Sequence, residues 1–219
     1  GDFGMFKSHL EDAGAIVVDT TEDWNRLVML TTLCPQITKI ASKKSTGIAV
    51  LTNAGFEKCA CADHLMVNGT EDIIHLPKWS EESLKVIKHV YKKQKITEVV
   101  DVSEVLDVTP IFTDIGYYEI LHAIFKDKEC DVGVIAGVPE TQSMKTQEWD
   151  IPDPEGIFQL TKKLKGEYPD KPLIAVVESG ERYQPLRRAF LSIGIATFDS
   201  IDAASKALVS VIKAANLRK

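Results

Sequence analysis

The sequence predicts an α/β fold in which helices cover both faces of a parallel β-sheet. Continuous apolar runs of strand length occur at residues 48–51, 132–136 and 173–177. Such runs, without polar alternation, are typical of strands buried on both faces. Amphipathic segments with helical spacing follow these runs. Alternation of the two patterns indicates strand–helix units that build a parallel sheet.

The first 43 residues form one strand between two helices. Phe3, Phe6 and Leu10 mark the first helix, residues 15–18 the strand, and Thr20 caps the second helix. A single strand cannot form a sheet of its own. The stretch 14–23 also resembles the stretch 194–203 near the other end. We therefore expect residues 1–43 to be the closing helix-strand-helix segment of a preceding α/β unit.

The pattern of residues 44–219 predicts one doubly wound, flavodoxin-like domain. Strands are expected at 48–51, 73–76, 99–102, 132–136, 173–177 and 195–198, with helices between them. Ser80 and Ser200 are expected N-caps, and Asp153 followed by Pro154 is expected to open a helix that Gly166 ends.

The turn after the first of these strands predicts an anion site. Asn53, Ala54, Gly55 and Phe56 connect an apolar strand to a helix. The first N–H groups of a helix have no partners within the helix, and its dipole is positive there. Phosphate is the anion that most often binds at such a turn.

Composition excludes several classes of protein. The 219 residues are 44% hydrophobic and 26% charged, with a formal net charge of −6. An acidic chain argues against a nucleic-acid partner or an anionic membrane surface. Four cysteines at irregular spacing, with no apolar run of membrane-spanning length and no signal peptide, predict a cytoplasmic protein. Cys61 and His64 could suggest a metal pair, but helix packing explains them better and no metal is expected.

One further carboxylate and two glycine-containing loops are expected at the same sheet edge. Asp101, near the end of the expected strand 99–102, could be a phosphoacceptor of response-regulator type or an Mg²⁺ ligand. A receiver domain, however, needs an acid pair where this chain has Thr52 and Asn53. A supporting hydrogen-bond acceptor is therefore the favoured role. Gly137 and Gly180 follow later strands, and their loops either close over a ligand or partner or serve as plain connections. Flavin would need a hydroxyl-rich loop, and this turn offers only Thr52.

In its order of features the chain resembles the C-terminal part of the NDP-forming acyl-CoA synthetases, the ADP-forming acetate–CoA ligases, relatives of succinyl-CoA synthetase. The resemblance is carried collinearly by these stretches: Gly47-Ile-Ala-Val-Leu-Thr-Asn-Ala-Gly55, Glu98-Val-Val-Asp-Val102, Val134-Ile-Ala-Gly-Val-Pro139, Lys171-Pro-Leu-Ile-Ala175, Glu178-Ser-Gly180 and Gly194-Ile-Ala-Thr-Phe198.

This resemblance implies a role in making acyl-CoA from an acid, CoA and ATP through an acyl phosphate and a phosphohistidine. The phosphohistidine is expected before Gly1, so no catalytic residue is expected within the chain. Asn53, Ala54, Gly55 and Phe56 would bind phosphate, with Asp101, Gly137 and Gly180 in support. The resemblance also implies ATP or ADP, Mg and CoA as cofactors of the full enzyme. It implies an ATP-grasp domain or subunit and a CoA-binding domain as partners, and a fragment that is inactive alone.

The chain departs from this family at the turn itself. Phe56 and Glu57 stand where the family has further glycines, and Glu98-Val99 replaces the usual Asn-Pro. A carboxylate in the first helical turn would repel a bound phosphate. The alternative is a non-catalytic flavodoxin-like interaction or regulatory domain with a degenerate phosphate loop.

Overall fold

A computed structural model describes residues 2–67 and 69–217 of the chain. Residues 1, 68, 218 and 219, and with them the outer bounds of the expected segments 1–43 and 44–219, lie outside the described residues. Within the described residues, six strands form a parallel sheet flanked by helices, as the sequence predicts. The strands are β1 (Thr46–Thr52), β2 (Ile74–His75), β3 (Val105–Asp107), β4 (Val132–Gly137), β5 (Leu173–Val177) and β6 (Ala196–Phe198).

The strand order places β1 and β4 next to each other at the centre, followed by β5 and β6. The two short strands β2 and β3 both pair with β1. Thr46 and Gly47 align with β2, whereas Val50 to Thr52 align with β3. One edge position of the sheet is therefore filled by two separate short strands, with a helix of the chain between them in sequence.

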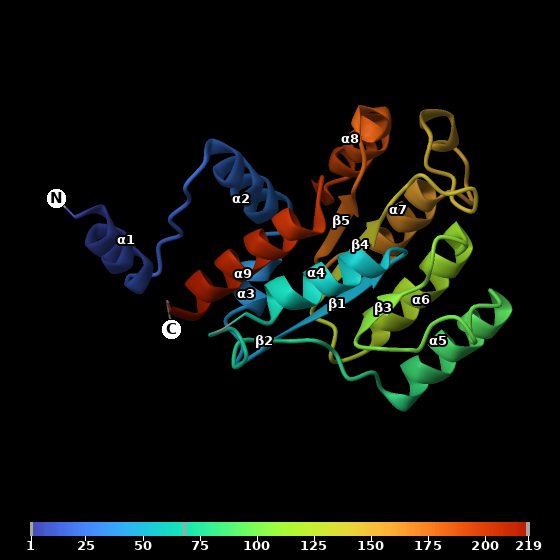
Figure 1. Cartoon of the computed structure of the whole chain (residues 1–219), viewed down its shortest axis with the longest axis horizontal. Helices are drawn as coiled ribbons and strands as arrows, with labels where there is room; N and C mark the ends of the chain where they lie inside the picture. Colours follow the sequence, from blue (N-terminus) through green and yellow to red (C-terminus); the bar gives the residue numbers. More distant parts are fainter. Residues whose placement is uncertain (1, 68, 218–219) are drawn as a thin grey trace.

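Two groups of helices cover the two faces of the sheet (Figure 1). The first group packs on the side chains of Ile48, Val50 and Val134, and the second on Leu51, Ile135 and Ala175. The first group contains α2 (Thr21–Leu33), α3 (Gln36–Ile40), α4 (Gly55–Leu65) and α9 (Ile201–Leu217). The second contains α5 (Glu81–Lys93), α6 (Asp114–Lys126), α7 (Ile157–Glu167) and α8 (Gln184–Ser192). Successive side chains of β1 point to opposite faces and both faces are covered, which explains why residues 48–51 are apolar throughout.

Helix-capping predictions succeed where a hydroxyl precedes the helix. Thr20, Ser80 and Ser200 accept hydrogen bonds from backbone N–H groups three residues ahead, at 3.0, 3.2 and 3.2 Å. The expected helix start at Asp153 is wrong, because α7 begins at Ile157 and its N-cap is Gly156. Asp153 instead accepts from Glu155 N–H and pairs with Lys145, so its carboxylate orders the preceding turn.

The expected strand 99–102 is also wrong. Val99 is 65% exposed, and the strand β3 forms six residues later, where Val105 and Leu106 are buried. The two stretches have nearly the same sequence, Glu98-Val-Val-Asp-Val102 and Glu104-Val-Leu-Asp-Val108. Register with β1 selects the second copy, and a local pattern cannot distinguish the two.

The expected strand at residues 15–18 does not form. A ten-residue helix, α1 (Phe3–Asp12), precedes it, and the segment then runs to α2 without pairing with any described strand. The short helix α3, not expected from the sequence, buries Ile37 beside Leu30 of α2 in the core under α9.

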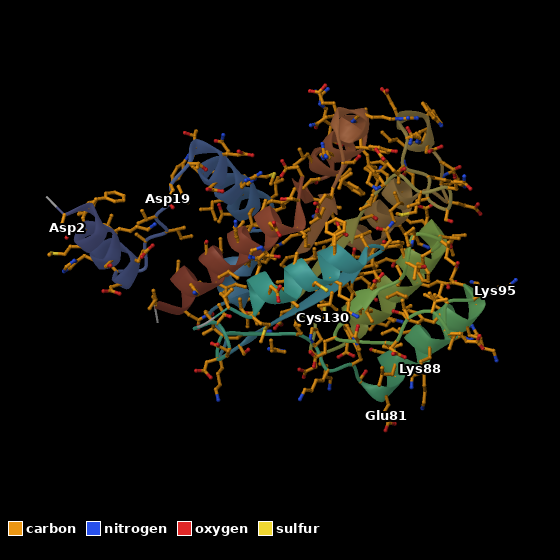
Figure 2. The ribbon with its side chains drawn as sticks, in the orientation of Figure 1. Asp2, Asp19, Glu81, Lys88, Lys95 and Cys130 are labelled. Atoms are coloured by element: carbon orange, nitrogen blue, oxygen red, sulfur yellow. The ribbon has the colours of Figure 1, made fainter. Side chains whose placement is uncertain are left out.

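Charged residues cover the outer side of α5. Glu81 and Lys88 of α5, and Lys95 just after it, are exposed on the outer edge of the molecule (Figure 2). Ile87, Val90 and Tyr91 of the same helix are buried. Among the described helices, none combines the length and the apolar character that a membrane crossing requires.

Candidate functional site

The candidate site lies where β1 and β4 end. The helix that follows β1, α4, and the helix that follows β4, α7, lie on opposite faces, so the carboxyl ends of these two strands form a topological switch point. Asn53, the residue after β1, is only 1% exposed. Its side chain donates to Val138 O at 3.0 Å and accepts from Val138 N–H at 2.9 Å. Asn53 therefore joins the two strand ends and positions the turn that follows.

The N-terminus of α4 presents two free backbone donors at this edge. Thr52 Oγ1 accepts the N–H of Ala54 at 3.1 Å. No acceptor among the described residues receives the N–H groups of Gly55 and Phe56, and both residues are exposed. Of the four expected phosphate-binding residues, these two have donors available to a ligand. Asn53 and Ala54 hold the turn in place through partners of their own.

Three carboxyl groups surround this helix end. Glu57, in the first turn of α4, is fully buried, and its Oε2 accepts a hydrogen bond from Thr52 Oγ1, while Oε1 has no hydrogen-bond partner in the described residues. Burial raises the pKa of Glu57 to about 7, against the Thr52 hydrogen bond that lowers it, and the nearby Glu178 and Asp107 carboxylates add to the rise. Near neutral pH the Glu57 carboxyl therefore holds a proton for much of the time.

Asp107 lies next to the turn from the other side. It is the last residue of β3, and a methyl group added to Gly55 would come within 3.3 Å of Asp107 Oδ2. Asp107 Oδ1 accepts the N–H of Thr109 at 3.0 Å. Its negative charge at the helix N-terminus is favoured by the helix dipole and competes with any external anion.

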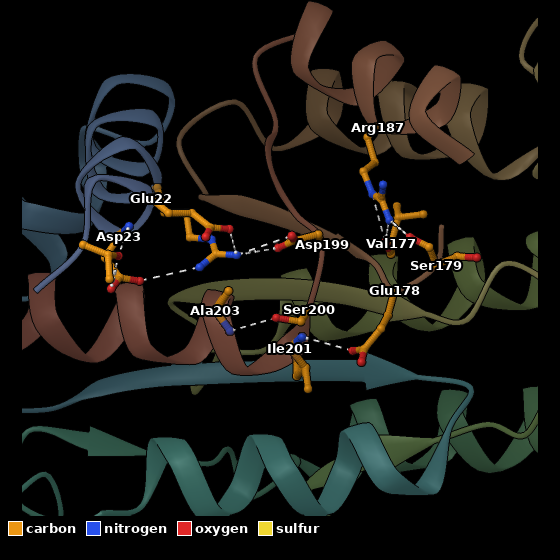
Figure 3. A network of polar contacts seen from close by, with 12 residues as sticks. Glu22, Asp23, Val177, Glu178, Ser179, Arg187, Asp199, Ser200, Ile201 and Ala203 are labelled. Atoms are coloured by element: carbon orange, nitrogen blue, oxygen red, sulfur yellow. Dashed lines mark hydrogen bonds and ion pairs between the residues drawn. The ribbon is translucent and has the colours of Figure 1, made fainter. Parts of the chain in front are cut away.

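Glu178, in the loop after β5, binds the N-terminus of a second helix, α9, at the same edge of the sheet (Figure 3). Its Oε2 accepts the first N–H of α9, from Ile201, at 3.2 Å. On the opposite side of the loop, Arg187 is buried and donates to the carbonyl oxygens of Val177 and Ser179. The loop after β5 is thus held on two sides. Its own Glu178 carboxylate binds the N-terminus of α9, and the Arg187 guanidinium of α8 binds its carbonyl oxygens.

Gly137 lies at this site and Gly180 lies further out. A methyl group on Gly137 would meet Asn53 Oδ1 at 3.3 Å and Tyr117 Oη at 3.5 Å, whereas one on Gly180 would have nothing within 4 Å. Asp101 is exposed in an irregular segment and is not at the end of any described strand. Asp107 takes the position that the sequence assigned to Asp101, and the near-repeat at residues 104–108 is the signal that could have found it.

The loop after β4 is tied down along its length. Asp114 Oδ2 accepts the N–H of Lys145 at 3.0 Å, and Thr146 Oγ1 donates to Pro139 O at 2.8 Å. Burial raises the pKa of Asp114 to about 6, with the hydrogen bond from Lys145 N–H opposing it. Beneath this loop lies an apolar cavity of about 30 Å³, which has room for one or two water molecules.

Cys61 and His64, the possible metal pair, have other partners. Cys61 Sγ accepts a hydrogen bond from Ser205 Oγ at 3.7 Å between α4 and α9, and His64 pairs with Asp202 at 3.0 Å. In residues 2–67 and 69–217, no group of three or more His, Cys, Asp or Glu side chains is arranged to hold a metal ion.

The chain is similar to known proteins in its three-dimensional structure. No protein-family model matches the sequence, and no curated protein matches it. The dinucleotide forming acetyl-coenzyme A synthetase 1 of Ca. Korarchaeum cryptofilum, in complex with phosphate and ADP, has a TM-score of 0.78 and 18% identity over 100% of this chain and 42% of its own. Its apo form gives a TM-score of 0.74 at 19% identity, covering 100% of this chain and 43% of that one.

The protein PH0766 from Pyrococcus horikoshii OT3 has a TM-score of 0.76 and 17% identity, over 99% of this chain and 45% of that one. The chain thus spans less than half the length of each of these three solved structures. At identities below 20%, these likenesses establish the fold. The chain has the α/β architecture of a part of an acetyl-coenzyme A synthetase chain.

Proposed function

We propose that this chain is a module of an NDP-forming acyl-CoA synthetase, and that the N-terminus of α4 binds a phosphoryl group during the reaction. The observation that carries the proposal is a fold match across the whole chain to an acetyl-coenzyme A synthetase whose structure contains phosphate and ADP. The exposed N–H donors of Gly55 and Phe56 support the same role, because they lie at the carboxyl edge of the sheet, where ligands of α/β folds bind.

The chain's contribution would be electrostatic. Two N–H groups at the positive end of a helix stabilise negative charge on phosphoryl oxygens without taking part in bond making. Asn53 fixes the direction of these donors by tying the turn to Val138. A proton on Glu57 would leave Asp107 as the main competing charge, since a neutral carboxyl does not repel phosphate.

The rest of the enzyme would lie outside these 219 residues. A phosphohistidine, a CoA-binding domain and an ATP-grasp domain or subunit would supply the chemistry with ATP or ADP, Mg and CoA. The free thiols of Cys34, Cys59, Cys61 and Cys130 accord with a reducing cytoplasm. This chain alone would not catalyse the reaction.

A substitution at Gly55 tests the role of the α4 turn. Gly55 is the first helical residue, where proline is well tolerated, and Ala54 before it has φ −134° and ψ 120°, as a residue before proline requires. Gly55→Pro removes the N–H and keeps the helix. In the complete enzyme, we expect it to slow phosphoryl transfer by about 10- to 100-fold, the loss of one hydrogen bond to a charged group.

Gly55→Ala is the matched control, because it adds a side chain near Asp107 and keeps the N–H. Its rate should stay within a few-fold of wild type. The rate is measured as ATP formed from acyl-CoA, ADP and phosphate by rapid quench. Equal rates for the proline variant and the wild type would remove the α4 turn from the mechanism.

A non-catalytic interaction or regulatory domain is the second candidate function. The specific observation in its favour is the buried Glu57 with Asp107 beside the turn, two carboxyl groups where a phosphate site would have none. If this second function is correct, calorimetric titration of the complete protein with inorganic phosphate should give the same heat of binding for the wild type and for Gly55→Pro. Phosphate binding that Gly55→Pro abolishes and Gly55→Ala keeps would contradict it.

A further inference from the structure

The N-terminal segment, residues 3–33, leaves apolar surface uncovered. No residue of α1 is buried, and Phe3, Met5 and Phe6 are 64%, 60% and 60% exposed. In Figures 1 and 2, α1 lies at one end of the molecule, apart from the sheet. On α2, Trp24 is 56% exposed. A ten-residue helix is marginal in water unless its apolar side chains pack against something.

This segment repeats the geometry of α8, β6 and α9. Gly14 has φ 80° and Gly194 has φ 75°, each just after a helix. The N–H of Ala15 donates to Leu10 O, and the N–H of Ile195 donates to Phe190 O, so both helices end with the same bond five residues back. The sequence likeness of residues 14–23 and 194–203 is therefore a likeness of structure.

The hydroxyl caps agree as well. Thr20 Oγ1 accepts from Asp23 N–H at 3.0 Å, and Ser200 Oγ accepts from Ala203 N–H at 3.2 Å. In each case the capped helix follows an apolar extended stretch. The order in both places is helix, left-handed glycine, extended segment, hydroxyl cap and helix.

The two units differ in one respect. In the second unit, residues 196–198 pair with β5 in parallel. In the first, the backbone N–H and C=O groups of Ile16, Val17 and Val18 have no hydrogen-bond partner within the described residues. Ile16 and Val18 pack against the core under α9, and an open groove of about 250 Å³ runs between residues 15–17 and α9. Unpaired strand groups of this kind bind another strand.

We infer that residues 15–18 are a sheet strand whose partner is the edge strand of a parallel β-sheet in another α/β unit. That sheet would pass between α1 and α2, because α8 and α9, the matching helices, cover opposite faces of the sheet in the second unit. The partner's helices or strands would cover Phe3 and Phe6 on one face and Trp24 on the other. The inference does not depend on the proposed function.

A second copy of this chain fits less well. In a two-fold symmetric pair, identical strands would run antiparallel, whereas the matching strand β6 pairs in parallel. The solved structures of similar fold are more than twice as long as this chain, so they contain additional units.

Hydrogen exchange tests this inference on the natural gene product purified from its source. There, we expect alternate amides among Ile16, Val17 and Val18 to exchange at least ~10-fold more slowly than in the 219-residue chain alone, as amides paired on one edge of a strand do. Phe6→Asp in the natural product should restore fast exchange, because it puts a charge into the covered face of α1. Ser8→Asp, at an exposed position of the same helix, is the matched control and should leave the protection intact.

Three results would overturn the inference. The first is equally fast exchange in the natural product and in the 219-residue chain. The second is protection in the 219-residue chain that rises with its concentration, which would identify a second copy as the partner. The third is protection in the natural product that Phe6→Asp leaves unchanged. Thermal unfolding of the 219-residue chain with Phe6→Asp verifies that the variant folds, since Phe6 buries little there.

Discussion

At the candidate site, burial of the Glu57 carboxyl opposes its ionisation and lowers the free energy of unfolding at neutral and higher pH. Glu57 is fully buried, its Oε1 has no hydrogen-bond partner among the residues that the structure describes, and Glu178 and Asp107 lie near it. Burial raises its pKa from 4.5 to about 7. Below pH 4.5 the carboxyl is protonated in both the folded and the unfolded state. Between pH 4.5 and about 7 the carboxyl ionises in the unfolded state and keeps its proton in the folded state, so stability is lost as the pH rises across this range, and the loss levels off above about 7.

Glu57→Gln therefore tests this loss of stability. Glutamine cannot ionise, and its amide can still accept from Thr52, so the variant should lose less stability than wild type between pH 4.5 and 7. At pH 8 the gain in free energy of unfolding should approach ~3 kcal/mol, the upper value set by the rise in pKa. Urea denaturation at a series of pH values measures it.

The control for this experiment is Glu98→Gln, at an exposed carboxylate without a hydrogen-bond partner or ion pair among the described residues. Its stability should follow wild type at every pH. If the Glu57→Gln curve also runs parallel to wild type from pH 4.5 to 8, Glu57 is not the group that titrates.

Asp101 and Asp107 show how far single residues can be assigned from sequence. Each stands in a Val-Val-Asp-Val or Val-Leu-Asp-Val stretch, six residues apart. The pattern predicts a strand that ends in an aspartate, and that prediction is confirmed for Asp107. The choice between the two depends on which stretch pairs with Val50 to Thr52 of β1, a contact across about 50 residues that no local signal contains.

At the scale of elements, the sequence predicts best the strands that are buried on both faces. The runs within β1, β4 and β5 are apolar throughout, so burial alone specifies them. Prediction fails where tertiary contacts decide. Asp153 followed by Pro154 is a typical helix N-terminal sequence. The two residues nevertheless lie in a turn before α7, where Asp153 forms an ion pair with Lys145. Residues 15–18 have a strand sequence and lack a strand partner in the described chain.

Close packing around β1 gives a prediction at this scale. A methyl group on Gly47 would lie 1.7 Å from the carbonyl oxygen of Glu129, a backbone atom that cannot move aside. Gly47→Ala should therefore lower the free energy of unfolding by at least ~2 kcal/mol, the usual cost of overpacking. Thermal or urea unfolding measures the change.

Gly166→Ala is the matched control, in the last turn of α7 with nothing within 4 Å of the added methyl. Since alanine favours the helix, this variant should gain about 0.5–1 kcal/mol. Equal stabilities for the two variants would contradict the close approach of β1 and the loop before β4.

At the scale of the whole molecule, the first 43 residues fall into two parts. Leu27 and Leu30 of α2 and Ile37 of α3 pack in the same core as β1 and α9, and Arg26 pairs with Asp199 in the loop before α9 at 3.0 Å. By contrast, α1 buries no residue. The core of the sheet domain therefore includes α2 and α3, whereas the part before α2 contributes only the partly buried Ile16 and Val18.

Two shortened chains test where the stable domain begins. A chain that starts at Thr20 removes α1, which buries no residue, and the unpaired segment, in which Ile16 and Val18 are partly buried, so its free energy of unfolding should fall by about 2 kcal/mol at most. A chain that starts at Ser42 also removes Leu27, Leu30 and Ile37, and the loss of each large buried side chain costs roughly 2–5 kcal/mol. That chain should be unfolded or molten at 25 °C by circular dichroism. If it instead unfolds cooperatively with the stability of the longer one, α2 and α3 belong with the preceding unit and not with the sheet that they cover.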